Sequence, residues 1–218
     1  MAKPSQREVV RALLERHGRT HAQDLGVDVS RNTPSPLFRL LIASLLFSAR
    51  ISSNVALEAA RALAEKGWTT APKMAGSTWS QRTKTLNRAG YARYDESTSR
   101  MIGESTDLLL ERWGGDLRKL RAEADRDPDQ ERPLLKAFKG IGDRGVDIFF
   151  REVQVAWDEI RPFADRPALD AAERLGLPAD PGKLEGLVSR KDFPRLVAAL
   201  VRTGIEQDFD QIQDQAAA

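Results

Sequence analysis

Apolar residues recur with helical spacing along almost the whole chain. In residues 5–18, Val9 and Leu13, with their neighbours Val10 and Leu14, form one apolar face, which is the pattern of an amphipathic helix. Residues 35–50, SPLFRLLIASLLFSAR, are apolar nearly all round, and this predicts a central, buried helix. No segment alternates apolar and polar residues as a strand does.

The remaining periodic segments are separated by glycine, proline and polar turns. They predict helices within residues 52–67, 77–90, 95–115, 133–139, 143–160, 166–178, 183–189 and 193–206. The predicted fold class is therefore all-α, with about ten helices joined by short connections.

The absence of cysteine restricts the chemistry available to the chain. With no cysteine among 218 residues, disulfides, thiolate zinc sites, cysteine-bound iron–sulfur clusters and cysteine nucleophiles are excluded. The two histidines, His17 and His21, both lie near the N-terminus, which argues against a histidine-based metal site or catalytic triad. We expect no cofactor beyond a monovalent cation, which is considered below.

The N-terminal residues are charged and follow a helical pattern, so they do not have the form of a signal peptide. The longest apolar stretch, LLIASLLF at 40–47, is far too short for a membrane span. We expect a cytoplasmic protein, without a membrane partner.

Positive charge is concentrated in one part of the sequence. Residues 35–103 hold ten basic and four acidic residues, a net charge of +6, whereas the whole chain carries +2. This asymmetry favours a polyanion facing one side of the protein. The alternative is that these arginines and lysines are ordinary solvated residues on helix faces.

Two glycines stand between apolar runs in residues 134–150, LLKAFKGIGDRGVDIFF. Gly140 and Gly142 allow positive φ on both sides of Ile141, whose side chain can then turn back into the core. The following helix would begin with unpaired N–H groups that can bind a phosphate. A tight corner between two helices, with no ligand, is the alternative interpretation.

The chain resembles the helix-hairpin-helix (HhH-GPD) DNA glycosylases of the endonuclease III type. Residues 134–150 are similar to the hairpin and its flanking helices, ADRPALDAAERLGLP to the segment with the catalytic aspartate, and LNRAGYARY to the loop with a duplex-wedging side chain. The resemblance covers about residues 35–178. It implies two helical lobes, one of residues 31–150 with the hairpin and one of residues 1–30 with 151–218. Many relatives carry a four-cysteine iron–sulfur cluster near the C-terminus, and this chain departs from them because it has no cysteine.

The resemblance assigns the catalytic carboxylate to Asp165, nine residues before Arg174-Leu175-Gly176. A fixed carboxylate can stabilise positive charge on the sugar and orient the attacking water. Asp165 can also cap the helix that begins near Pro167. Asp170 is the weaker catalytic candidate and is expected to be a surface residue.

Relatives that also cut the sugar–phosphate backbone carry a lysine at the second position after the hairpin, where this chain has Arg144. Arginine remains protonated and cannot form a Schiff base. The resemblance therefore implies a monofunctional glycosylase, unless Lys136 or Lys139 reaches the pocket. Arg144 could contact a phosphate, or pair with Asp143 or Asp147.

The expected DNA-binding residues are Gly140, Ile141, Gly142, Lys139, Arg50 and Tyr91. Arg50 corresponds to the residue that fills the gap in the base stack, and Tyr91 to the wedge. As alternatives, Arg50 caps the C-terminus of its helix and Tyr91 packs on the edge of the core. The resemblance also implies a Na⁺ or K⁺ ion at hairpin carbonyls from around Lys139 to Gly142.

The implied function is excision of a damaged or mismatched base from double-stranded DNA by a monomeric, nucleoid-associated enzyme of base-excision repair. Alkylated purines, oxidised pyrimidines and mismatched adenine or thymine all remain open as substrates, and the missing cluster slightly favours alkylated purines. A non-catalytic module that recognises distorted duplex, and a helical domain with no DNA partner, are the alternatives.

Overall fold

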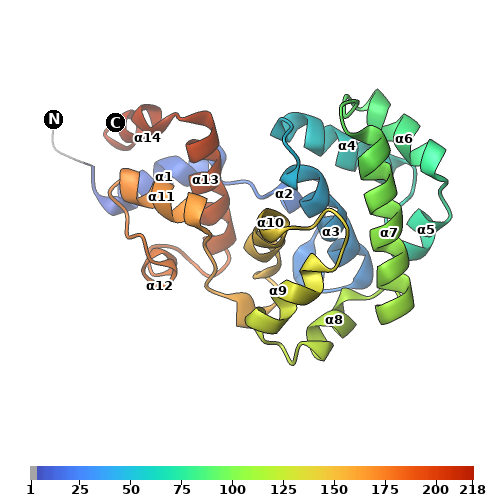
Figure 1. The fold of residues 1–218 in the computed structure, drawn as a ribbon. Coiled ribbons are helices and arrows are strands. Elements are labelled where there is room, and N and C mark those ends of the chain that lie inside the picture. Colours follow the sequence, from blue (N-terminus) through green and yellow to red (C-terminus); the bar gives the residue numbers. More distant parts are fainter. Residues whose placement is uncertain (1–3) are drawn as a thin grey trace. The chain divides into compact units, whose positions relative to one another are not determined.

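The computed structural model describes residues 4–218, which form helices and turns without a strand (Figure 1). The prediction of an all-α chain is confirmed. Short helices that the sequence pattern did not predict bring the total above the ten or so expected. The helices are α1 (Gln6–His17), α2 (His21–Asp24), α3 (Pro34–Ser48), α4 (Ser53–Glu65), α5 (Ala71–Ala75), α6 (Trp79–Arg88), α7 (Asp95–Trp113), α8 (Leu117–Glu123), α9 (Pro128–Lys136), α10 (Asp143–Val153), α11 (Arg166–Arg174), α12 (Pro181–Glu185), α13 (Phe193–Glu206) and α14 (Phe209–Ala216).

The chain divides into two compact units. Residues Ala22–Glu159 form the middle lobe, and the N-terminal residues up to His21 join Ile160–Ala218 in the terminal lobe. The middle lobe is larger than the predicted 31–150, because both flanking segments pack on it. The Ala22 N–H donates to Glu152 (3.1 Å) and the Trp157 indole donates to Asn32 (3.1 Å).

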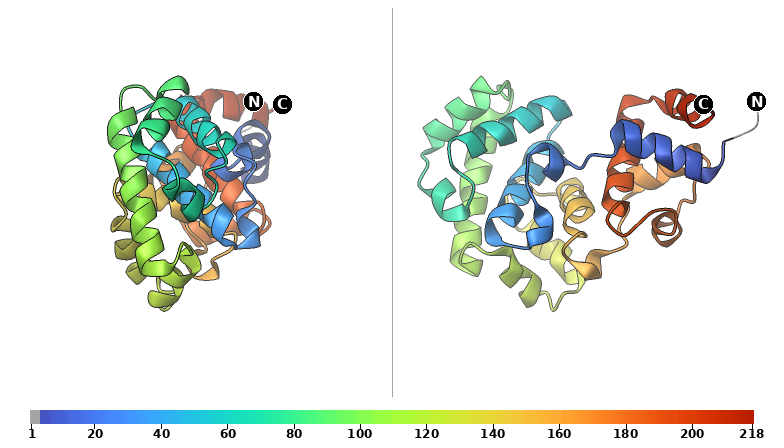
Figure 2. Two further views of the ribbon diagram at one scale, coloured as in Figure 1. Left: turned by 90° about the vertical axis from the view of Figure 1, so that its right-hand side faces the viewer. Right: turned by 180° about the vertical axis from the view of Figure 1, so that it is seen from behind.

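Helix α3 forms the core of the middle lobe, as its all-round apolar pattern predicts. It packs against α4 and α10, which lie beside it in Figures 1 and 2. Leu37, Phe38, Leu41 and Leu46 of α3 are almost completely buried. Each such side chain contributes roughly 1.5–3 kcal/mol relative to an exposed one.

The terminal lobe joins the two ends of the chain. Helix α1 lies beside α13 and α14, and α11 packs on α13 (Figure 2). Ala168 and Ala172 of α11 and Leu196 and Leu200 of α13 are fully buried in one apolar cluster. Small alanine side chains let α11 approach α13 closely.

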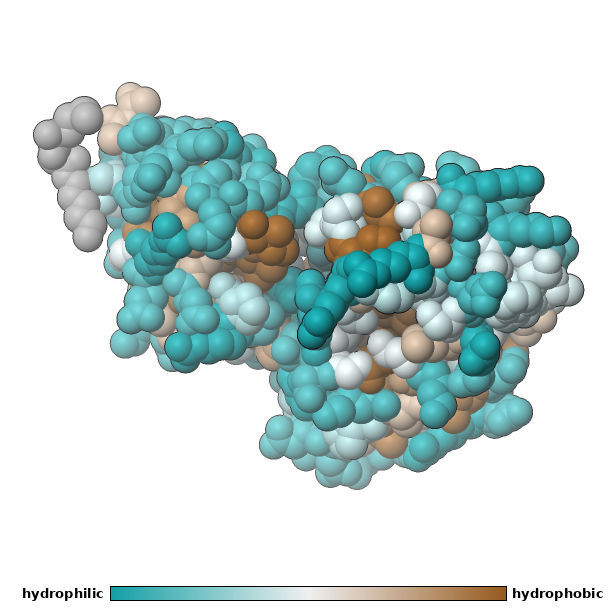
Figure 3. Space-filling model, turned by 45° about the horizontal axis from the view of Figure 1, so that its top comes forward, coloured by the Kyte–Doolittle hydropathy of each residue, from teal (hydrophilic) through white to brown (hydrophobic). Residues whose placement is uncertain are grey.

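Most of the surface is polar. The face drawn in Figure 3 is largely hydrophilic, with small apolar patches, and the large apolar side chains exposed among residues 4–218 are Trp79, Val155 and Ile205. Within the same residues, every helix is too short or too polar to cross a membrane.

Three ionisable side chains meet inside the middle lobe. Arg121 pairs with Glu159 through two hydrogen bonds, and its guanidinium lies 5.4 Å from the centre of the Trp157 ring. Glu131, which is 0% exposed, faces the same pair. Burial, and then the neighbouring Glu159 carboxylate, raise the pKa of Glu131 to about 8. Burial is the largest single influence on the pKa of Glu159 and acts upward, but the hydrogen bonds from Arg121 and from its own backbone, the neighbouring Glu131 and the charge of Arg121 together lower that pKa.

The raised pKa predicts that the middle lobe loses stability as pH rises from about 5 to 8. In this range native Glu131 keeps its proton while the unfolded carboxyl releases it, so the free energy of unfolding falls by at most about 1.4 kcal/mol per pH unit. Glu131→Gln should flatten this dependence in urea titrations at several pH values. Glu111→Gln, at an exposed position of the same lobe, should retain it. An unchanged slope in Glu131→Gln would contradict the assignment.

Candidate nucleic-acid interface

The hairpin turns at Gly140, between α9 and α10. Gly140 has φ of +82°, a conformation that side chains disfavour. A Cβ atom there would lie 2.8 Å from the Met101 sulfur and 3.2 Å from Leu45 Cγ. Glycine is therefore required at this position both by the backbone and by the packing of the turn on α3 and α7.

Ile141 turns back into the core, as the spacing of the two glycines predicts. Its side chain is buried, and its N–H donates to the Phe138 carbonyl (3.1 Å). A Cβ atom at Gly145 would lie 3.3 Å from Ile141 Cγ2, so the first turn of α10 sits close against this side chain. Ile141 can therefore offer only its backbone to an external ligand.

Gly142, in contrast, is not required by the fold. It is the N-cap of α10 with φ of −97° and ψ of −168°, an extended conformation open to any residue. A Cβ atom there would meet nothing within 4 Å. No side chain caps α10, and its first hydrogen bond runs from the Val146 N–H to the Gly142 carbonyl (3.0 Å). The backbone N–H groups of the first turn of α10, before Val146, therefore lie next to an exposed glycine that has open space around it.

Two exposed cations flank this helix start without an ion pair among residues 4–218, namely Lys139 and Arg144. The expected alternative partners of Arg144 are taken by other residues. Asp143 pairs with Lys136 (2.8 Å) and Asp147 with Arg132 (2.9 Å). The hydrogen bond from Lys136, and then its charge, lower the pKa of Asp143. The alternative that Arg144 pairs with one of these aspartates was therefore wrong.

Two serines lie against the hairpin carbonyls. Ser105 of α7 donates to the Lys139 carbonyl (3.0 Å). The Ser48 hydroxyl of α3 lies 3.4 Å from the Gly140 carbonyl, and its single proton has a shorter contact with the Leu45 carbonyl (2.8 Å). The sequence carried no signal for these contacts, because the partners lie 34 and 92 residues apart. Ser105 engages one of the carbonyls expected to bind a monovalent cation, and that cation remains a prediction.

Arg50 lies exposed in the turn after α3. It makes no hydrogen bond to the carbonyls at the end of its helix, so the capping alternative was wrong. Its guanidinium has no ion pair within residues 4–218 and is accessible to a ligand. Ser52, two residues on, caps α4 by accepting from the Val55 N–H (3.4 Å).

The position of Tyr91 contradicts its expected role as the side chain that wedges into the duplex. Its side chain is 0% exposed, and its hydroxyl donates to the Leu46 carbonyl (3.2 Å). Burial raises the pKa of this phenol. The alternative that Tyr91 packs on the core is correct, because the turn at Gly90 (φ +85°) directs the ring inward.

The basic segment contributes fewer surface charges than its sequence suggests. Arg82 is buried and donates to the carbonyls of Ser77 (2.7 Å) and Ser99 (3.1 Å), and Arg39 donates to the Leu25 carbonyl (2.9 Å). Burial lowers the pKa of both guanidinium groups. These two cations serve the fold and leave eight basic residues in the segment for other roles.

Asp165 belongs to the terminal lobe, so the lobe that carries the hairpin does not contain it. It is the N-cap of α11 by position, yet its side chain accepts no capping hydrogen bond from that helix. The residue is 7% exposed and is preceded by the buried Ala164. Asp170 is exposed and pairs with Arg166 (2.7 Å), as expected for a surface residue.

No protein-family model matches this chain, and no curated protein sequence does either. Among solved structures, it is similar to a trapped covalent endonuclease III–DNA intermediate with estranged adenine, at 19% identity and a TM-score of 0.49, covering 77% of this chain and 73% of the other. It is also similar to a non-covalent endonuclease III–DNA complex, at 19% identity and a TM-score of 0.50, covering 77% of this chain and 72% of the other. The protein has the helical fold of endonuclease III.

Proposed function

We propose that the protein is a DNA glycosylase that hydrolyses the N-glycosidic bond of a damaged or mismatched base flipped out of double-stranded DNA. The observation that carries this proposal is the start of α10. There an uncapped helix N-terminus, an exposed glycine and two exposed cations meet, on a fold shared with endonuclease III. A DNA phosphate is the ligand that this combination suits.

Asp165 is the proposed catalytic carboxylate. Glycosidic cleavage leaves positive charge on the sugar, and a fixed anion in a poorly solvated position stabilises that charge more strongly than one in water. The low exposure of Asp165 suits this role. The same carboxylate can accept a proton from the attacking water.

The proposed reaction is hydrolysis alone, without cutting of the sugar–phosphate backbone. Arg144 cannot act as an amine nucleophile at any working pH, and Lys136 is held in an ion pair with Asp143. Lys139 is the remaining lysine of the hairpin. We propose that it contacts the phosphate backbone.

A non-catalytic module that binds distorted duplex is the second candidate. The burial of Tyr91 favours it, because that position then supplies no aromatic wedge to hold a flipped base. Asp165 separates the candidates, since an enzyme needs this carboxylate and a binding module does not.

Duplexes that each contain one lesion should be incubated with the wild type, Asp165→Asn and Asp170→Asn, then analysed with and without hot alkali. We expect alkali-dependent strand breaks for one lesion class, a loss of at least about 100-fold in Asp165→Asn, and near-normal activity in Asp170→Asn. Breaks without alkali would show that a lysine acts as a lyase. No product from any lesion, with salt-sensitive binding intact, would favour the binding module.

The two hairpin glycines should respond differently to alanine. Gly140→Ala should lower the free energy of unfolding by about 1–3 kcal/mol, because it meets an unfavourable φ and two side chains. Gly142→Ala should leave stability within about 0.5 kcal/mol but weaken duplex binding, because its methyl group occupies the space of the proposed phosphate. Urea denaturation and fluorescence anisotropy would measure the two effects. Unchanged DNA affinity in Gly142→Ala would show that the hairpin does not contact the DNA.

The unpaired cations should account for part of the salt dependence of DNA binding. Removing one phosphate contact reduces the slope of log affinity against log salt by about 1, so Arg50→Gln and Arg144→Gln should each show this reduction. Lys119→Gln, at an exposed position on α8, is the matched control and should retain the wild-type slope. Equal salt-dependence slopes in all variants would show that neither Arg50 nor Arg144 contacts a DNA phosphate.

A further inference from the structure

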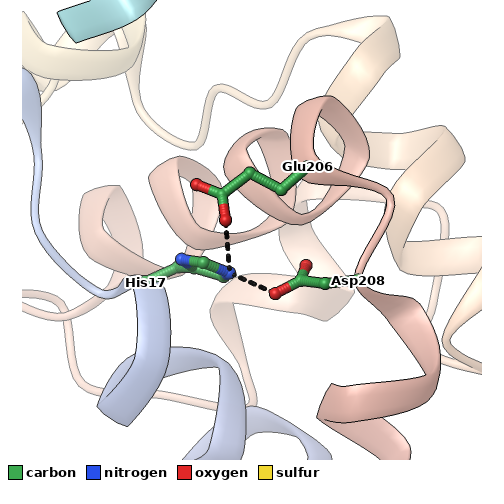
Figure 4. Close-up of side chains that lie close together, drawn as sticks. All are labelled: His17, Glu206 and Asp208. Atoms are coloured by element: carbon green, nitrogen blue, oxygen red, sulfur yellow. Dashed lines mark hydrogen bonds and ion pairs between the residues drawn. The ribbon is translucent and has the colours of Figure 1, made fainter.

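A histidine and two carboxylates from opposite ends of the chain meet in the terminal lobe (Figure 4). His17 is the last residue of α1, Glu206 is the last residue of α13, and Asp208 is the N-cap of α14. His17 Nε2 lies 2.8 Å from Asp208 Oδ2 and 3.9 Å from Glu206 Oε2. The candidate ligand atoms all lie within 4.8 Å of one another.

The backbone between α13 and α14 brings the two carboxylates to one side. Gln207 ends α13 in the left-handed conformation, with φ of +57°, and its N–H donates to the Thr203 carbonyl (2.8 Å). This turn reverses the chain between Glu206 and Asp208. Both side chains therefore approach the same histidine ring (Figure 4).

Asp208 provides a second, independent indication that an ion binds here. The residue is 7% exposed. Its Oδ2 atom accepts from His17 and from Arg16, whereas its Oδ1 atom is buried and has no hydrogen-bond partner. A buried carboxylate oxygen without a partner is unfavourable, and an unplaced ion is one of the recognised explanations.

We propose that His17, Glu206 and Asp208 bind one divalent transition-metal ion of the Zn²⁺ class. One imidazole nitrogen with two carboxylates is a set of ligands that suits Zn²⁺. In a tetrahedral site with bonds of about 2.0–2.2 Å, two ligand atoms lie about 3.3–3.6 Å apart. The two separations from His17, 2.8 Å and 3.9 Å, lie on either side of that range, so small side-chain rotations are needed to bind the ion. The side chain of Glu206 is 55% exposed and can move to complete the site, which would remain open to solvent for a water ligand.

Arg16 shapes this site without being a ligand. It donates to Asp208 Oδ2 and to Gln211, and so fixes the carboxylate through the oxygen that also faces His17, while Oδ1 has no hydrogen-bond partner. The positive charge of Arg16 also repels a bound metal ion. Metal affinity should therefore be lower than at a similar site that has no neighbouring arginine. The bound ion would join α1 to the α13–α14 turn and stabilise the folded terminal lobe.

The test uses the full, tag-free chain, Zn²⁺ in isothermal titration calorimetry, and thermal unfolding with and without Zn²⁺. We expect one Zn²⁺ per chain and a higher melting temperature. His17→Gln and Glu206→Gln should each weaken binding by at least about tenfold. His21→Gln and Asp210→Asn, the other histidine and an exposed carboxylate of α14, should remain within about twofold.

Glu206→Gln keeps the test interpretable, because its exposed side chain can change without disturbing the contacts of Asp208 with Arg16 and His17. Its metal-free melting temperature should match that of the wild type. Absence of saturable binding, or equal affinity in Glu206→Gln and wild type, would overturn the proposal. A loss in His21→Gln as large as that in His17→Gln would do so too.

Discussion

The left-handed turn at Gly140 is the constraint on which the candidate interface depends. Its Cα hydrogen faces Leu45 of α3 and Met101 of α7, where a methyl group would not fit. The turn is thereby attached to the most buried helix of the middle lobe, and Ser105 holds the Lys139 carbonyl, which immediately precedes Gly140. Because Gly140 and Ile141 are fixed from inside, the uncapped start of α10 has a defined direction. A phosphate arriving there would meet N–H groups that need no rearrangement, which is the condition under which backbone donors bind an anion well.

The same contacts divide the basic residues of the middle lobe into separate roles. Arg82 and Arg39 donate to backbone carbonyls in poorly solvated places. They therefore stabilise connections between helices and add little to the electrostatic potential at the protein surface. Lys136 and Arg132 neutralise aspartates of α10. This pairing leaves Arg144, Lys139 and Arg50 as exposed cations near the hairpin and the end of α3. A polyanion near the hairpin would therefore meet these three side chains, in addition to the other exposed basic residues of the segment.

The terminal lobe is held together by contacts between distant parts of the sequence. Its helices pack through alanine, leucine and valine side chains, without any covalent or thiolate link. Polar contacts add to this packing where α1 ends, because His17 and Arg16 both reach Asp208 from about 190 residues away. Asp165 belongs to this lobe, so its position depends on how α11 packs on α13. The proposed metal site and the proposed catalytic carboxylate thus share one apolar core, although they serve different purposes.

Local patterns were sufficient for part of this description. Helical periodicity predicted the all-α class and the burial of α3, and Gly-Ile-Gly predicted an inward Ile141, because each depends on neighbours within one or two turns. The side chains that face one another across the fold could not be predicted in this way. Tyr91 was expected to be a wedge but lies in the core, and the two aspartates considered as alternative partners of Arg144 pair with other cations. His17, Glu206 and Asp208 showed no shared motif. Burial and pairing are set by contacts between segments far apart in the chain, and only the tertiary structure decides those contacts.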